Sequence, residues 1–346
     1  AARAATPDSL LIFWNTAAIA VYVWGVFPST DTPEASASQL RWFPRWPTAV
    51  LMYGVMGMAV LAKGPVGLVL PTAVIGMYLL VRRLPPSASD THVSSASWFG
   101  RCVRMMRPFE PRHFLTTCWL MRPITAMAVV AAVALPWYIA VWLRTDGAWV
   151  QGFLMDHNVG RAARSLEGHS GTILYYPVAL LIGFFPWSVF AVPTIQESVR
   201  RLRTRATRKP GFVLAACWIG VYLTLFSIAR TKLPSYITPC YPAVALLVAS
   251  FLAAWCRGTS LAAPYWPRIA LTCLGLIGLG LAIAVPIAAA RYVPGEEWLA
   301  VIGCVPILTA IAAMGFVRAK SPRRAVVTFA AGAVLFTTSL FAIGAA

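Results

Sequence analysis

The chain has 346 residues, of which 59% are hydrophobic and only 12% are charged, and its mean hydropathy is +0.71. Soluble domains carry roughly 45–50% apolar and about 25% charged residues. The charged residues here therefore cannot cover a water-soluble globule, which excludes a soluble enzyme and a disordered chain. Lys and Arg that flank apolar spans explain the net charge of +18 better than nucleic-acid binding does, so no nucleic acid is expected as a partner.

Apolar runs bounded by charged residues, Pro or Gly predict about ten transmembrane helices. The expected fold is therefore all-α and polytopic, with one transmembrane domain over residues 1–346. In chain order the runs cover residues 8–27, 47–62, 66–81, 122–143, 172–194, 211–229, 236–255, 268–290, 298–317 and 325–344. The second and third are predicted to be two short helices joined by a tight turn, because one straight helix would be about 50 Å long against a hydrocarbon core of about 30 Å.

The cations predict how these helices are oriented. If residue 1 lies outside and the segments alternate, most Lys and Arg fall in inner loops, which is the positive-inside pattern of membrane proteins. The cations left outside are Arg3, Lys63, Arg144, Arg161, Arg164, Arg230, Lys232 and Arg291. No Asp or Glu lies in the middle of a span and no internal repeat is present, which argues against an ion-coupled transporter. The seven cysteines are scattered and predict neither a zinc cluster nor a disulfide framework.

Two short outer segments place cations beside unusual backbone. Lys63 precedes Gly64-Pro65 at the outer end of a helix, where its ammonium group either snorkels at a hairpin tip or meets an anion at the membrane surface. The second segment contains Arg230, Lys232 and Tyr236. It is either an ordinary span boundary or a phosphate-binding turn that combines cations with a phenol hydroxyl.

The long outer loop over residues 144–171 holds a different kind of candidate. Asp146 is predicted to cap a helix that lies in the membrane interface. The apolar residues of that helix are Trp149, Val150, Phe153 and Leu154. Asp156 and His157 follow, and a carboxylate beside an imidazole either ligates a metal ion or belongs to a solvated polar loop.

Four motifs, in this order, resemble the aminoarabinose transferases. They are Lys63-Gly64-Pro65; His157-Asn158-Val159 with Arg161; Glu167-Gly168-His169-Ser170-Gly171 followed by Tyr175-Tyr176 and Pro186-Trp187; and Arg230-Thr231-Lys232-Leu233-Pro234 with Tyr236. That family transfers 4-amino-4-deoxy-L-arabinose to lipid A and, with the protein O-mannosyltransferases, belongs to the GT-C glycosyltransferases. The resemblance covers essentially the whole chain. It implies a GT-C type fold and a polyprenyl-phosphate sugar donor, whose isoprenoid tail would lie in a groove between apolar spans.

The resemblance also implies roles for individual residues. The family's phosphate contacts carry over to Lys63, Arg161 and Tyr236, and we add Lys232 because it lies close by in the sequence. The family's outer loop contributes a His to a zinc site, so His157 or Asp156 is expected to bind zinc or another divalent cation. No Gly-rich nucleotide-binding loop is present, and no nucleotide cofactor is expected.

One part of the family pattern is missing from this sequence. The chain aligns with the family only from about the fourth span, without the first spans and without the first outer loop, which carries an acidic motif and the proposed catalytic Asp. The catalytic residue is therefore expected outside these 346 residues, and this C-terminal portion alone is expected to be inactive.

The predicted function is the transfer of a sugar, an aminoarabinose-like pentose or a hexose, from a polyprenyl-phosphate donor. The acceptor is expected to be lipid A or another glycan or protein, at the outer face of a bacterial inner membrane. Two alternatives stay open: a transporter of lipid-linked sugars, and a non-catalytic truncated remnant that binds lipid but transfers nothing.

Overall fold

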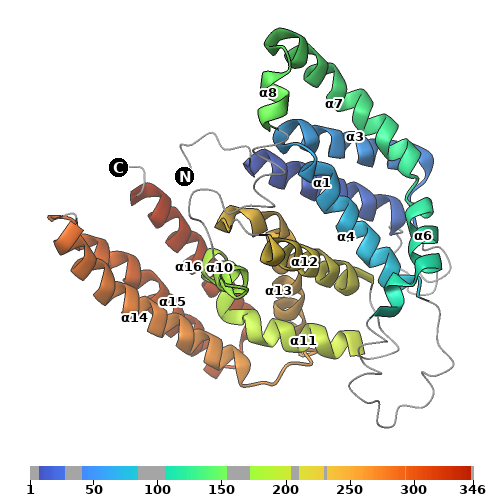
Figure 1. The fold of residues 1–346 in the computed structure, drawn as a ribbon. Coiled ribbons are helices and arrows are strands. Elements are labelled where there is room, and N and C mark those ends of the chain that lie inside the picture. Colours follow the sequence, from blue (N-terminus) through green and yellow to red (C-terminus); the bar gives the residue numbers. More distant parts are fainter. Residues whose placement is uncertain are drawn as a thin grey trace. The chain divides into compact units, whose positions relative to one another are not determined.

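The computed structural model describes residues 8–27, 41–84, 106–153, 172–203, 210–229, 232–292 and 294–343. All regular secondary structure in these residues is helical (Figure 1). Within these described residues, eight helices are long and apolar enough to cross a membrane, or nine if one bent pair counts as a single span. The prediction of an all-α polytopic membrane protein is confirmed.

Each of the ten predicted segments falls on helical structure. The elements are α1 (Asp8–Val26), α3 (Trp46–Lys63), α4 (Val66–Arg82), α7 (Pro123–Thr145), α10 (Tyr175–Gly183) with α11 (Ala191–Arg203), α12 (Pro210–Ile228), η6 (Pro234–Cys240) with α13 (Tyr241–Cys256), α14 (Trp266–Tyr292), α15 (Val301–Arg318) and α16 (Pro322–Ile343). Shorter elements are η2 (Arg107–Phe109), α6 (Pro111–Leu120), α8 (Ala148–Gln151), η4 (Trp187–Phe190) and η7 (Glu297–Ala300).

Two of the ten predicted spans differ from simple transmembrane helices. The fifth is bent by 117° between Gly183 and Trp187. Pro186 lies in this break, where it lacks an N–H group and disfavours helical backbone in the residue before it. The third, α4, has only 17 residues, so its length of about 26 Å is below the core thickness of about 30 Å.

The helices form two compact units. The first consists of Ala1–Pro177 and Val213–Ala243, and the second of Val178–Phe212 and Val244–Ala346. In the first unit α1 packs against α3, α4 and η6, and α3 also packs against α4 and α7.

The hairpin between α3 and α4 depends on two glycines. Gly64 ends α3 with a positive φ of 78°, a conformation that favours glycine. At Gly67, a Cβ atom would lie 2.3 Å from the carbonyl carbon of Ala59, so only glycine lets the two helices approach this closely. The predicted tight turn between two short helices is therefore confirmed, and it places Lys63 at the tip.

In the second unit, α14, α15 and α16 pack as consecutive antiparallel helices. A Cβ atom on Gly303 would lie 2.4 Å from the backbone nitrogen of Ala282, which means that α14 and α15 touch through their backbones. Phe190 lies in the core of this unit, with ring centroids 4.9 Å from Phe329 and 6.2 Å from Phe251. Edge-on aromatic contacts and close backbone packing hold helices together where lipid removes the hydrophobic driving force.

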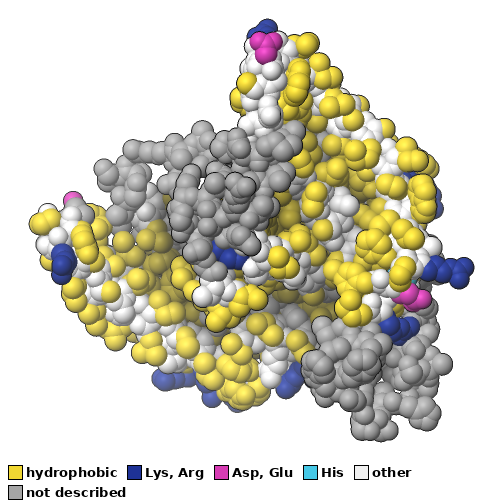
Figure 2. Space-filling model, in the orientation of Figure 1, with side chains coloured by type: hydrophobic (Ala, Val, Ile, Leu, Met, Phe, Trp, Pro, Cys, Tyr) yellow, Lys and Arg dark blue, Asp and Glu magenta, His cyan; other side chains and the backbone are white. Residues whose placement is uncertain are grey.

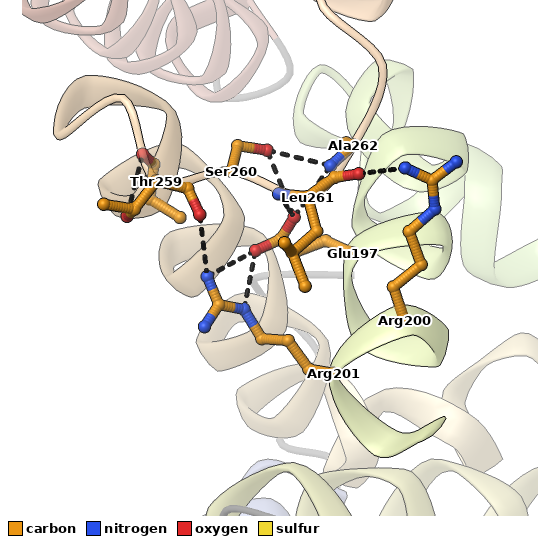
Figure 3. A network of polar contacts seen from close by, with 8 residues as sticks. Glu197, Arg200, Arg201, Thr259, Ser260, Leu261 and Ala262 are labelled. Carbon is orange, nitrogen blue, oxygen red and sulfur yellow. Dashed lines mark hydrogen bonds and ion pairs between the residues drawn. The ribbon is translucent and has the colours of Figure 1, made fainter. Parts of the chain in front are cut away.

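One buried carboxylate connects α11 to the loop between α13 and α14 (Figure 3). Glu197 is 0% exposed. Its Oε2 accepts hydrogen bonds from the backbone N–H groups of Leu261 at 2.6 Å and Ala262 at 3.0 Å, and from the Ser260 hydroxyl at 3.1 Å. Its Oε1 accepts from Nε and Nη2 of Arg201, both at 2.6 Å. The charge is thus paired and its lone pairs are used, as a buried carboxylate requires.

On α11, apolar side chains are exposed and polar side chains are buried, the reverse of the pattern in a surface helix of a soluble protein. Val192, Ile195 and Val199 are exposed, whereas Glu197 and Ser198 are buried. Spacings of three and four residues put the exposed side chains on one face of the helix. In water this arrangement would be unfavourable, so the apolar face is suited to lipid.

Large apolar side chains also cover the outer surfaces of both units, and Figure 2 shows hydrophobic atoms over most of the visible helices. On α14, for example, Leu276, Leu279, Ile283 and Ile287 are all exposed. Monomeric soluble proteins rarely expose apolar patches of this extent. These surfaces therefore face the hydrocarbon core of a bilayer.

The orientation of the helices can be tested with single cysteines in a background that lacks accessible native cysteines. We expect Asp146→Cys and Tyr292→Cys, at helix ends predicted to be outside, to react with an impermeant reagent on intact cells. Arg45→Cys and Arg324→Cys, at the predicted inner ends, should react only after permeabilisation, because the inner loops carry most of the cations. The reverse labelling pattern would overturn the predicted orientation.

Candidate functional site

Lys63 and Asp8 form an ion pair at one end of the first unit. Lys63 is the last residue of α3 and Asp8 the first of α1, and the ammonium group contacts Oδ1 of the carboxylate. The two side chains are 21% and 23% exposed, respectively. The pair is therefore partly shielded from water but still accessible to a ligand.

Tyr236 lies against the same lysine. The Lys63 Nζ atom is 5.2 Å from the centroid of the Tyr236 ring, within the range of a cation–π contact. Phe226, near the end of α12, packs against the Tyr236 ring, and the centroids of the two rings are 5.1 Å apart. The structure thus brings together Lys63 and Tyr236, two residues that the sequence predicts to contact phosphate.

Lys232 is close to this site but is bound differently. It is only 5% exposed, and its ammonium group donates hydrogen bonds to the carbonyl oxygens of Phe226 at 3.0 Å and Ser227 at 2.6 Å. These carbonyls belong to the last turn of α12, where they have no partner within the helix. Burial lowers the pKa of Lys232 from its ordinary value. Two of its three donors are therefore used to cap α12.

Tyr176 completes the surroundings of Lys232. Its ring centroid lies 5.4 Å from the Lys232 Nζ atom. Its hydroxyl accepts a hydrogen bond from the backbone N–H of Leu233 at 3.3 Å. Tyr176 thereby fixes the start of the turn that carries Tyr236.

A hydrogen-bonded pair lies deeper in the first unit, two helical turns below Asp8. The Asn15 side chain is 0% exposed, and its amide nitrogen donates to the Tyr222 hydroxyl at 3.1 Å. Leu11 and Asn15 are buried on the face of α1 that also carries Asp8, three and seven residues after it. This face of α1 is therefore fixed against α12, which orients Asp8 toward Lys63.

An apolar pocket of about 470 Å³ adjoins the turn that carries Lys63. Its lining comes from the α3–α4 hairpin, α7 and α8. The lining residues are Val60, Pro65, Leu68, Met127, Val130, Ala131, Ala134, Leu135, Tyr138, Ile139, Trp142 and Val150. The Tyr138 hydroxyl donates to the carbonyl of Val60 at 3.2 Å and is thereby satisfied. Such a lining suits a hydrocarbon chain.

The predicted role of Asp146 is wrong. Asp146 does not cap the following helix but ends α7 in a left-handed conformation, with φ of 46°. The backbone N–H of the next residue, Gly147, donates a hydrogen bond to the carbonyl oxygen of Trp142 at 3.0 Å. Gly147 is the N-cap residue of α8, so no side chain caps the start of this helix. The chain reverses here, so Asp146 closes one helix instead of starting the next.

The short helix predicted after Asp146 is present over its first turn. α8 covers Ala148–Gln151, and the Trp149 ring stacks on Phe153 with centroids 4.9 Å apart. Trp149 also meets the edge of Trp137 on α7 at 5.1 Å. These aromatic contacts hold α8 against α7 beside the pocket.

Several predicted site residues lie outside the described residues, namely Arg161, Asp156, His157 and Leu154. In the part of the chain that is described, no three His, Cys, Asp or Glu side chains cluster as metal ligands. The roles of Asp156 and His157 at zinc or another divalent cation stay predictions.

Sequence reasoning missed Asp8, Tyr176 and Phe226. Asp8 is the first residue of the apolar run over residues 8–27, and its partner Lys63 is 55 positions away in the sequence. Tyr176 belongs to the third motif, which does not predict its contacts with Lys232 and Leu233. Only the packing of α1, α3, α10 and α12 brings these side chains to one place.

Comparisons with known proteins point to one family. No protein-family model matches the sequence. The undecaprenyl phosphate-α-4-amino-4-deoxy-L-arabinose arabinosyl transferase of Pectobacterium carotovorum is 32% identical over 205 residues, which cover 56% of this chain and 35% of that protein. The protein of the same name from Photorhabdus laumondii is 26% identical over 245 residues, which cover 70% of this chain and 36% of that protein. This chain therefore spans about a third of the length of these curated relatives.

A solved structure has the same fold. ArnT from Cupriavidus metallidurans, determined bound to undecaprenyl phosphate, superimposes with a TM-score of 0.65 at 23% identity. The match covers 96% of this chain and 52% of that protein. The structure of the same protein in the apo state gives a TM-score of 0.62. The resemblance predicted from the four motifs is confirmed, and the fold is ArnT-like.

Proposed function

We propose that this chain, a distant relative of the aminoarabinose transferases, is part of a membrane glycosyltransferase that uses a sugar linked to undecaprenyl phosphate. The observation that carries the proposal is that Lys63, whose side chain is partly exposed, lies in the α3–α4 hairpin, from which Val60, Pro65 and Leu68 line an apolar pocket of about 470 Å³. A lipid phosphate needs both a cation for its head and an apolar site for its tail. Lys63 supplies the cation, and the same hairpin, together with α7 and α8, supplies the apolar pocket.

The chemistry of sugar transfer suggests a role for each of the proposed phosphate-binding residues. Transfer breaks the bond between the sugar carbon and the phosphate oxygen, and the bond electrons leave with the lipid phosphate, which gains negative charge. A preorganised ammonium group at that oxygen stabilises the charge that develops. Lys63 is the proposed donor of this stabilisation, and the Tyr236 hydroxyl and Arg161 add hydrogen bonds. The base that takes the proton of the acceptor is not assigned to a residue of this chain.

The acceptor and the place of the reaction follow from the same proposal. Lipid A, or another glycan or protein, would receive the sugar at the outer face of a bacterial inner membrane. Asp8, Lys63 and Tyr236 meet at helix ends that the cation distribution predicts to face outward.

The tail pocket can be tested by filling it. Ala131 lines the pocket, whereas the neighbouring Ala132 is exposed and is not among the lining residues. In detergent, we expect Ala131→Phe to weaken binding of undecaprenyl phosphate at least about tenfold, because several buried CH₂ groups lose about 0.8 kcal/mol each. Ala132→Phe is the matched control and should bind like the unaltered chain.

The length of the lipid provides a second comparison. Geranyl phosphate keeps the phosphate but loses most of the tail, so the two variants should differ less with this ligand than with undecaprenyl phosphate. Equal affinities of both variants for undecaprenyl phosphate would contradict the pocket assignment. Failure of the unaltered chain to bind undecaprenyl phosphate would contradict the proposed function.

A further inference from the structure

The side chain of Arg122, at the start of α7, lies against two aromatic rings. Its guanidinium carbon is 4.3 Å from the centroid of the Trp46 ring and 5.6 Å from that of the Phe43 ring, within the range of cation–π contacts. The side chain is half-buried, and its Nη1 atom is buried without a hydrogen-bond partner among the described residues. A buried donor of this kind is stabilised by an acceptor, and a guanidinium group binds anionic oxygens best.

The fold holds Arg122 in this position. Its φ of 53° lies in the left-handed region, which is unfavourable for a residue with a side chain. Tyr53 of α3 stabilises the turn, because its hydroxyl donates to the carbonyl oxygen of Met121 and its ring packs against Phe43 with centroids 6.5 Å apart. Phe43 itself is only 6% exposed. The position of the arginine and of one of its two rings is therefore set by packing within the first unit.

Two parallel helices begin at this place. A Cβ atom on Gly57 of α3 would lie 2.8 Å from Cβ of Val133 of α7. Further along both helices, the Tyr138 hydroxyl donates to the carbonyl of Val60 at 3.2 Å, so α3 and α7 run in the same direction. The first turns of both helices therefore lie at the same end of the unit, where the positive ends of their dipoles add to the charge of Arg122.

This positive charge is not paired by a carboxylate in the described part of the chain. Arg45 and Arg122 are the N-cap residues of α3 and α7, and neither helix start has a side-chain cap. Neither arginine takes part in the ion pairs formed by Asp8 and Glu197. A helix dipole repels a cation at its N-terminus and stabilises an anion there. An anion beside Arg122 would offset both arginines and both dipoles.

The surroundings of Arg122 match the headgroup region of a membrane. α3 has 18 residues and is about 27 Å long, so Trp46 lies close to one hydrocarbon thickness away from Lys63 at the other end. Trp42 and Trp46 are 45% and 57% exposed, as expected for aromatic residues at the membrane interface. Ile124, two residues after Arg122, is 72% exposed and faces lipid. An anion that reaches Arg122 with an apolar chain beside it is a lipid headgroup.

We propose that Arg122 binds the phosphate of an anionic phospholipid of the inner leaflet, whose acyl chain packs against Ile124. The planar guanidinium group can donate to two phosphate oxygens at once. A zwitterionic phospholipid is a poorer ligand, because Arg45 and the two helix dipoles repel its ammonium group. This site is separate from the proposed site for undecaprenyl phosphate, since Lys63 lies at the opposite end of α3.

The test measures phospholipid binding to the purified chain in detergent by native mass spectrometry. Dioleoyl phosphatidylglycerol should bind at least about tenfold more tightly than dioleoyl phosphatidylethanolamine, which has the same acyl chains. Arg122→Asn removes the guanidinium group but tolerates the left-handed backbone. This variant should bind phosphatidylglycerol at least about tenfold more weakly and bring the ratio of the two affinities close to one.

Two further variants separate a specific site from general attraction and from a structural role. Arg324→Asn removes an exposed cation in the first turn of α16, also at a predicted inner end, and should keep the preference for phosphatidylglycerol. Arg122→Lys keeps the charge but loses the two-pronged contact, so it should retain part of the preference; it also carries the test if Arg122→Asn does not fold. A purely structural arginine predicts instead a lower transition temperature with an unchanged ratio.

Inorganic phosphate distinguishes a lipid from a free anion. It lacks the acyl contacts and should displace phosphatidylglycerol only at concentrations at least about a hundredfold higher than the lipid. The proposal is wrong if phosphate binds as tightly as the lipid, or if the unaltered chain does not prefer phosphatidylglycerol. It is equally wrong if both Arg122 variants keep the full preference, or if Arg324→Asn loses as much of it as Arg122→Asn. None of these results affects the proposed function.

Discussion

Replacing Lys63 with Met is expected to weaken the binding of undecaprenyl phosphate about ten- to a hundredfold, because hydrogen bonds to charged groups contribute about 1.5–3 kcal/mol. Lys63 is partly exposed and pairs with a carboxylate that a ligand can displace. Lys232, in contrast, is held by two backbone carbonyls. The measurement is the dissociation constant of undecaprenyl phosphate for the purified chain in detergent.

Two controls make this result specific. Lys320→Met removes an exposed cation at the opposite, predicted inner side and should leave the dissociation constant unchanged. Lys63→Arg keeps the charge and should recover part of the affinity, although the planar guanidinium group cannot reproduce the geometry of the ammonium group. A Lys63→Met chain that binds as tightly as the unaltered chain would remove Lys63 from the site.

Replacing Glu197 with Ala is expected to destabilise the protein by about 3–5 kcal/mol, the usual effect of removing one partner of a buried ion pair. The substitution leaves the Arg201 guanidinium, whose side chain is 18% exposed, without its carboxylate. It also removes the acceptor for two backbone N–H groups, those of Leu261 and Ala262. Thermal unfolding in detergent should show a clearly lower transition temperature.

The matched control for this change is Glu110→Ala. Glu110 is an exposed carboxylate that precedes α6 and makes no side-chain cap hydrogen bond. Its removal should leave the transition temperature nearly unchanged. Glu197→Gln keeps an acceptor oxygen and should fall between the two. Equal transition temperatures for Glu197→Ala and Glu110→Ala would show that the buried network does not stabilise the fold.

The membrane fold could be predicted from the sequence because lipid exposure leaves a strong compositional signal. A run such as residues 122–143 predicted α7 within a few residues of its bounds, Pro123–Thr145. The fifth segment could not be predicted as well. Hydropathy averages over α10 and α11 and does not reveal a bend of 117° between them.

The buried polar contacts of α11 could not be predicted from the sequence either. Glu197 lies just after the predicted span of residues 172–194, in a stretch that reads as a charged inner loop. Its partners Ser260, Leu261 and Ala262 are more than 60 positions away, and two of them contribute only backbone atoms. No pattern of side chains in the sequence can therefore identify that contact.

The candidate site was predicted in part. The resemblance to the aminoarabinose transferases implies phosphate contacts for Lys63 and Tyr236, and the structure places the Lys63 Nζ atom 5.2 Å from the centroid of the Tyr236 ring. Lys232 was added because it lies close by in the sequence, and this proximity does not distinguish an exposed cation from one that caps a helix. That difference depends on how α12 ends, and the two carbonyls involved have no signature in the sequence.

The way in which Glu197 holds its loop also bears on how this protein can diverge. Two of its hydrogen bonds come from the backbone N–H groups of residues 261 and 262, which every amino acid except proline provides. The side chain of Leu261 is 41% exposed and can therefore vary while the path of the loop is retained, whereas Ala262 also packs against the hydrophobic core. Among relatives, position 261 should tolerate almost any residue but proline and position 262 only small residues, whereas a change at Glu197 should require a matching change at Arg201.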